Sequence, residues 1–197
     1  MRFVPVFVAV SLCIAAAQPS QPTPTVTGIP YSADQLQEHT TLENGKPVNS
    51  AYVIGHFFRD SQGRARTESA LKSSPAWRIE IRDPVAGFAY VLDDQNKVVY
   101  RTSTQVTASR PNASQATTVS LGTQAIAGVL AEGIRTTFLS PSGLPTLSVE
   151  TWYSAELNVT MLTKSSNGYS SKLVNLRREE PDPVLFRPPA DYTVVDR

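Results

Sequence analysis

The chain has 197 residues, with 18 Lys and Arg side chains against 17 Asp and Glu and a formal net charge of +1. This length is enough for one domain with a hydrophobic core. The near-neutral balance, with no basic stripe and no polybasic block, argues against nucleic acid as a partner and against a charged membrane-surface patch.

The first residues have the pattern of a secretory signal peptide. Arg2 precedes an apolar run from Phe3 to Ile14, and alanines follow at 15–17. This is the order of the n-region, the h-region and the small-residue cleavage site of exported proteins. The run is shorter than a membrane-spanning helix, so a retained anchor is the less favoured alternative. We therefore expect residues 1–17 to be cleaved, and an intact mass to show a mature chain that begins near Gln18.

Cys13, the single cysteine, lies inside this apolar run. Leu12 precedes it, where a lipidated cysteine needs a small residue, so we expect Cys13 to be lost with the signal peptide. The mature chain then has no disulfide, no thiol nucleophile and no thiolate metal site. Secreted eukaryotic domains usually depend on disulfides, so a cysteine-free exported domain is typical of a bacterial envelope. The predicted location is the periplasm or the extracellular space.

Residues 18–29 are rich in Pro, Ser and Thr, which indicates a disordered linker. We expect residues 30–197 to form a single β-rich domain. Within it, apolar and polar residues alternate with the period of two that strands require, and turn dipeptides such as Asn44-Gly45 separate the segments. The strand segments that this pattern predicts, about ten in number, lie at 37–43, 48–59, 64–71, 77–82, 88–92, 98–101, 117–121, 129–139, 147–153, 157–163 and 171–177.

The clearest strand is "WRIEIR" at 77–82. Trp77, Ile79 and Ile81 fall on one face, and three charged residues fall on the other. We expect Trp77→Ala to lower the unfolding free energy by roughly 3 kcal/mol, because the substitution deletes an aromatic side chain that the pattern places in the core. The opposite face should be tolerant, so Arg78→Ala should cost less than about 0.5 kcal/mol.

The segment "SVETWYSAELNV" at 148–159 gathers the residue types of a catalytic cluster. Its alternation instead predicts two strands joined by a corner at Ser154, whose hydroxyl can bond nearby backbone. Glu150 and Glu156 lie on different strands with no geometry that pairs them. A nucleophile needs a base within hydrogen-bond reach, so we interpret the segment as structural.

The C-terminal segment carries too many prolines for a long helix or a central strand, yet it is too apolar for a free tail. We expect residues 181–186 to make one helical turn that places Phe186 against the sheet. Residues 192–194 should then pack along a strand edge, which would suppress edge-to-edge aggregation.

Six segments of the chain form a recognisable series: "PYSADQ" (30–35), "RDSQGRAR" (59–66), "RDPVAGFAYVLD" (82–93), "LGTQAIAGVLAEGIRT" (121–136), "ETWYSAEL" (150–157) and "REEPDPVLFRPPADYTV" (178–194). Together they resemble a family of uncharacterised bacterial exported proteins. A second, more distant pattern is a strand ending in Asp and a turn, then "KVVY", "G-x-x-x-I-x-G", "W-x-S" and a closing "F-x-x-P-x-x-Y". It is similar to outer-membrane lipoprotein-sorting carriers, which implies a curved antiparallel half-barrel around an apolar concavity. The long helices that plug the concavity in those carriers have no counterpart in this sequence.

The fold prediction is all-β: a curved antiparallel β-meander, half-barrel-like, of about ten strands. We expect an exported, non-catalytic envelope protein that binds a lipid, an acyl chain or a protein partner in the concavity. One alternative is an interaction module with a filled core and an exposed apolar patch. Another is a hydrolase, which would bring a His, Ser or carboxylate pair together in a pocket. The side chains expected to line the concavity are Tyr52, Ile54, Phe58, Trp77, Tyr90 and Trp152.

The sequence predicts neither a metal site nor a cofactor. His39 and His56 are the only histidines, both within strand patterns, whereas a zinc site needs three or four convergent ligands. His56 is expected on the same face as Tyr52, Ile54 and Phe58. The acidic pairs and clusters of the chain lack the spacing of a calcium loop.

Overall fold

The computed structural model describes residues 29–71, 76–104 and 116–197. The expected signal peptide and nearly all of the expected linker lie outside the described residues, so cleavage near Gln18 remains a prediction. No helix in the described part of the chain is long and apolar enough to cross a membrane.

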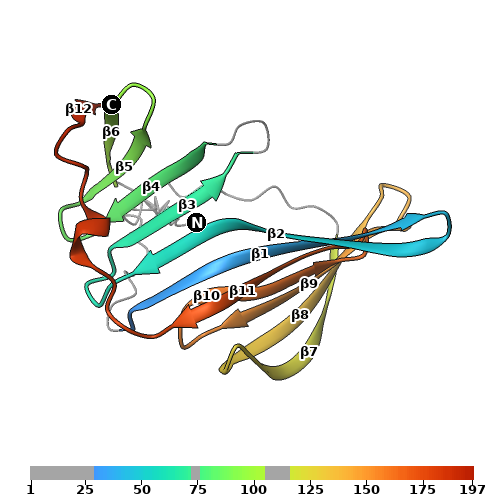
Figure 1. Cartoon of the computed structure of the whole chain (residues 1–197). Coiled ribbons are helices and arrows are strands. Elements are labelled where there is room, and N and C mark those ends of the chain that lie inside the picture. The colour runs from blue at the N-terminus through green and yellow to red at the C-terminus, as the bar shows by residue number, and fades with distance from the viewer. Residues whose placement is uncertain (1–28, 72–75, 105–115) are drawn as a thin grey trace, which may run out of the picture.

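The described residues form one open, curved sheet of 12 strands (Figure 1). This confirms the all-β prediction. A short 3-10 helix, η1 (Pro183–Phe186), precedes the last strand. The strands are β1 (Tyr31–Glu43), β2 (Lys46–Arg59), β3 (Ala65–Ala70), β4 (Trp77–Asp83), β5 (Phe88–Asp93), β6 (Val98–Ser103), β7 (Ala116–Ile126), β8 (Val129–Leu139), β9 (Pro145–Ser154), β10 (Val159–Ser165), β11 (Tyr169–Arg177) and β12 (Thr193–Asp196).

The sheet consists of two antiparallel meanders joined side by side. Its strand order is β12-β6-β5-β4-β3-β2-β1-β11-β10-β9-β8-β7. The halves meet where β1 pairs with β11, a contact between opposite ends of the domain. β12 differs from the other described strands because it runs parallel to its neighbour, β6. Turn signals predict hairpins between successive strands, but they do not specify these two long-range pairings.

Five irregular positions interrupt the described ladders, and they accompany the curvature of the sheet. Extra residues lie at Ile54 in β2, Leu121 in β7 and Met161 in β10. Two more irregularities lie where β11 pairs with β1 and where β9 pairs with β8. Each bulge bends its strand and increases the local twist, which favours an open curved sheet over a flat one.

β4 shows the alternation that "WRIEIR" predicts. Ile81 is 1% exposed and lies opposite Tyr90 of β5. Arg78 and Glu80 form an exposed ion pair on the other face. Trp77 begins the strand and is only half-buried. Ile81, and not Trp77, is therefore the most deeply packed side chain of β4.

The burial of each β4 side chain predicts how much stability its replacement by alanine should cost. We expect Ile81→Ala to lower the unfolding free energy by about 2–5 kcal/mol, because it deletes a fully buried side chain. Arg78→Ala should cost less than about 0.5 kcal/mol. Chemical denaturation of the two variants measures both values. Equal losses would contradict the assignment of the two faces.

The core is divided into two hydrophobic clusters. The large cluster lies on β1 and on β8 to β11, and the small cluster lies on β4 to β6 beneath η1. The buried residues of the large cluster are Tyr31, Ala33, Val129, Ala131, Trp152, Leu157, Met161, Leu162 and Leu173. Those of the small cluster are Ile81, Leu92, Val99 and Phe186.

The predicted corner at Ser154 is confirmed. The buried Ser154 Oγ accepts a hydrogen bond from the Leu157 backbone N–H at 3.2 Å. The two glutamates of the segment are separated, since Glu150 pairs with Arg135 and Glu156 pairs with Arg178.

The predicted arrangement of the C-terminal segment is also confirmed. Asp182 caps η1 by accepting a bond from the Val184 N–H at 2.9 Å. Phe186 is 1% exposed within the small cluster. The chain then passes Tyr192, which packs on the same cluster, and adds β12 to the edge of β6.

Candidate functional site

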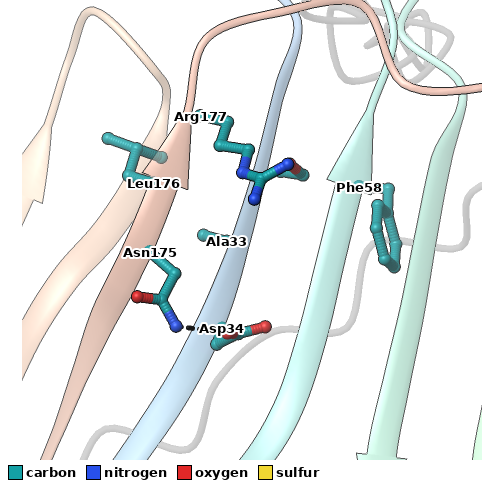
Figure 2. Close-up of a pocket in the computed structure, with 7 residues that line it drawn as sticks. Ala33, Asp34, Phe58, Asn175, Leu176 and Arg177 are labelled. Carbon is teal, nitrogen blue, oxygen red and sulfur yellow. Dashed lines mark hydrogen bonds between the residues drawn. The ribbon is translucent and has the colours of Figure 1, made fainter.

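A pocket of about 470 Å³ lies across β11, β1 and β2 (Figure 2). Phe58 packs against the small cluster and shares a face of the sheet with its partner Ser32. Ala33 and Leu176 alternate with Ser32 and Arg177, so their side chains lie with the large cluster on the other face. The remaining lining residues are polar: Ser32, Asp34, Asn175 and Arg177.

An irregularity in β11 builds one wall of this pocket. Asn175 and Leu176 together lie opposite the single residue Ala33 of β1. Asn175 has φ +52°, a left-handed conformation that Asn tolerates better than most residues. Its amide nitrogen donates to Asp34 Oδ2 at 2.7 Å, as Figure 2 shows.

Asp34 connects three strands. Its Oδ1 lies 2.6 Å from His56 Nδ1 on β2, and its Oδ2 accepts the bond from Asn175 on β11. The ring of His56 lies 4.8 Å from the ring of Trp77, centroid to centroid. The hydrogen bond from Asn175 is the largest cause that lowers the pKa of Asp34. Partial burial opposes it, and His56 and Arg177 act in the same direction as Asn175.

This lowered pKa predicts a pH-dependent contribution to stability. Because the pKa of Asp34 falls below its ordinary value of 3.8 in the folded state, the ionised carboxylate stabilises the fold above that value. The contribution is lost as the pH falls through the folded pKa. We therefore expect Asp34→Asn to be less stable than the wild type at neutral pH, and the difference to shrink below about pH 4.

Urea denaturation across this pH range measures the difference. Asn175→Gly keeps a residue that accepts positive φ but removes the amide donor, so it should reproduce part of the effect. A difference between the wild type and Asp34→Asn that stays constant down to low pH would contradict this prediction.

Arg177 supplies a positive charge at the rim of the pocket. Its side chain is mostly exposed and reaches from β11 across β1 (Figure 2). Its ion pair with Glu179 is long, at 3.7 Å. A pocket with the apolar side chain of Phe58 on one side and charged groups at its rim can hold a ligand that is apolar at one end and polar at the other.

The six side chains that the sequence placed in a concavity do not converge. Phe58 lines the pocket, and Trp77 contacts His56 beside it. Tyr90 packs on the small cluster. Five strands separate the strand of Trp152 from that of Trp77, and Trp152 belongs to the large cluster.

Tyr52 and Phe58 lie on opposite faces of the sheet, contrary to the expected shared face. Tyr52 pairs with Gln37 and Phe58 pairs with Ser32, positions of opposite parity on β1. The extra residue is Ile54, which reverses the alternation of β2. His56 shares the face of Phe58, as expected, and not that of Tyr52.

Sequence reasoning missed the polar part of the pocket. Asp34, Asn175 and Arg177 meet only through the β1–β11 pairing, which no local pattern specifies. One residue could have indicated an irregularity in this strand. Asn is depleted in strand interiors, and Asn175 lies within the strand predicted at 171–177. No group of three or more His, Cys, Asp or Glu side chains in the described ranges could hold a metal ion.

No protein-family model matches the chain, and no curated protein matches it. An uncharacterized conserved protein from Thermus thermophilus has a similar structure, with a TM-score of 0.50, 13% identity, and coverage of 86% of this chain and 91% of that one. This likeness shows the fold alone.

Two other structures align less well. The MucA/MucB complex of Pseudomonas aeruginosa aligns at a TM-score of 0.44 and 12% identity, over 85% of this chain and 58% of that one. An outer membrane lipoprotein-sorting protein domain from Vibrio parahaemolyticus aligns at 0.19 and 12% identity, over 80% and 92%. Both TM-scores are below 0.5, so neither likeness carries weight for function.

Proposed function

We propose that this chain is an exported, non-catalytic envelope protein that binds an amphipathic ligand in the pocket across β11, β1 and β2. The observation that carries the proposal is the combination of apolar and charged groups in that pocket. Its volume of about 470 Å³ lies within the range of small-molecule sites. An acyl chain would lie against Phe58, and its polar end would lie toward Arg177.

Binding of oleate, measured by calorimetry, tests this proposal. Ser32→Trp fills the pocket from β1 and should weaken binding at least about tenfold. Thr41→Trp is the matched control, because Thr41 lies on the same strand in its exposed part. It should bind oleate as the wild type does. Equal affinities of the two variants, or no binding by the wild type, would contradict the proposal and favour an interaction module without a ligand.

A hydrolase is the second candidate, and one observation favours it. Asp34 holds His56 Nδ1 at 2.6 Å, the kind of contact that orients a catalytic histidine. The described contacts place no hydroxyl nucleophile on the other ring nitrogen. We therefore expect the wild type and His56→Asn to hydrolyse p-nitrophenyl esters equally slowly. Hydrolysis that depends on His56 would support the second candidate instead.

A further inference from the structure

β7 forms an edge of the sheet that lacks the usual protection against pairing. Among the described strands it pairs with β8 alone. Its 11 residues, "ATTVSLGTQAI", include no charged residue and no proline. Natural edge strands are usually short, charged, interrupted by proline or covered.

The opposite edge of the same sheet is protected. There the terminal strand β12 has only 4 residues. Its Asp196 accepts two bonds from the Arg101 guanidinium, which places charge at the outer edge. Within the described residues, the fold therefore protects one edge of the sheet and leaves β7 unpaired on its outer side.

Apolar side chains border the β7 edge. Val119 is 59% exposed on β7 itself, and Leu130 and Ile134 of β8 are 62% and 45% exposed. Leu130 pairs with Ala125, and Ile134 pairs with Ser120, so these two β8 side chains stand directly beside the edge strand. A strand added to β7 would cover part of this surface.

We propose that two copies of the chain pair through the 116–120 run of β7, antiparallel across a twofold axis. The extra residue at Leu121 ends the regular stretch, so residues 116–120 offer the longest straight run before the bulge. A twofold pairing sets β7 of one copy antiparallel to β7 of the other copy. Because β7 carries no charged residue, this pairing places no like charges opposite one another. Thr117, Thr118 and Val119 are β-branched, which favours strand pairing.

Sedimentation of the chain expressed from Gln18 tests the proposal over a wide concentration range. The wild type should form a dimer. Thr118→Lys places a like charge on both copies at the centre of the run, so it should shift the protein to monomer. Thr160→Lys is the matched control, since Thr160 is an exposed position on the interior strand β10 and should leave the dimer intact.

Disulfide formation provides the second measurement, because a chain from Gln18 has no cysteine of its own. Thr118→Cys should form an intermolecular disulfide on oxidation, whereas Thr160→Cys should not. Circular dichroism and thermal melting establish that each variant is folded. A monomer at all concentrations, a dimer that Thr118→Lys leaves intact, or a dimer in which Cys at 118 does not cross-link would overturn the proposal.

Discussion

Truncation after Arg178 is expected to lower the melting temperature and to promote association. It removes Phe186, which is 1% exposed and fills the small cluster against Ile81 and Val99. Loss of one buried aromatic side chain costs about 3–5 kcal/mol. The same truncation removes β12 and leaves the backbone of β6 as an open edge, which is a template for pairing with another chain.

Two further variants separate these effects. Phe186→Ala should lose stability while keeping β12, so it should melt early but keep the oligomeric state of the full chain at concentrations where the truncated chain associates further. Truncation after Val194 removes the last part of the exposed strand β12, with its backbone pairing to β6 and the Arg101–Asp196 ion pair. It leaves Phe186 in place and should cost less than about 1 kcal/mol. Thermal melting and light scattering measure the two properties. A chain ending at Arg178 that melts and sediments like the full domain would show that the C-terminal segment is a passive extension.

Substitution of Gly133 by leucine is expected to destabilise the fold strongly. Gly133 of β8 lies opposite Trp152 of β9, and a Cβ atom there would lie 2.6 Å from the indole ring. Trp152 is 8% exposed and packed in the large cluster, so the ring has little room to move. Overpacking of this kind costs about 1–3 kcal/mol and occasionally more. Trp152→Ala should cost about 3–5 kcal/mol by leaving a cavity.

The double variant is the sharper measurement. In Gly133→Leu with Trp152→Ala, the new side chain occupies space that the indole has left, so the combined loss should be smaller than the sum of the single losses. Denaturation of the four proteins gives the coupling free energy. Additive losses would show that the two residues do not compete for the same space. Gly133→Leu as stable as the wild type would contradict the packing itself.

Short sequence patterns predicted the features that depend on neighbouring residues: the faces of a strand, a tight turn and a helical turn. The alternation of Trp77 to Arg82 placed Ile81 inside, because the side chains of a strand alternate between two faces. Asn44-Gly45 predicted a tight hairpin, and both residues have the positive φ that such a turn requires. The prolines and Phe186 of the C-terminal segment predicted η1 and its contact with the sheet.

The rest depends on pairings that no local pattern encodes. β1 joins β11 across the whole domain, and this pairing brings Asp34 to Asn175. A single extra residue at Ile54 reversed the face predicted for Tyr52 relative to Phe58. A bulge adds one residue to a strand without a distinct composition, so the alternation before it and the alternation after it give conflicting faces. The predicted concavity residues were therefore divided between two faces and two clusters.

Native mass spectrometry of the purified protein tests the proposed function most directly. We expect the wild type to carry a bound amphiphile, seen as added mass that is lost on activation in the gas phase. Ser32→Trp, purified in the same way, should show the bare chain, while Thr41→Trp should keep the added mass. A wild type that shows only the mass of its own chain, or an added mass that Ser32→Trp retains, would contradict ligand binding in the pocket across β11, β1 and β2.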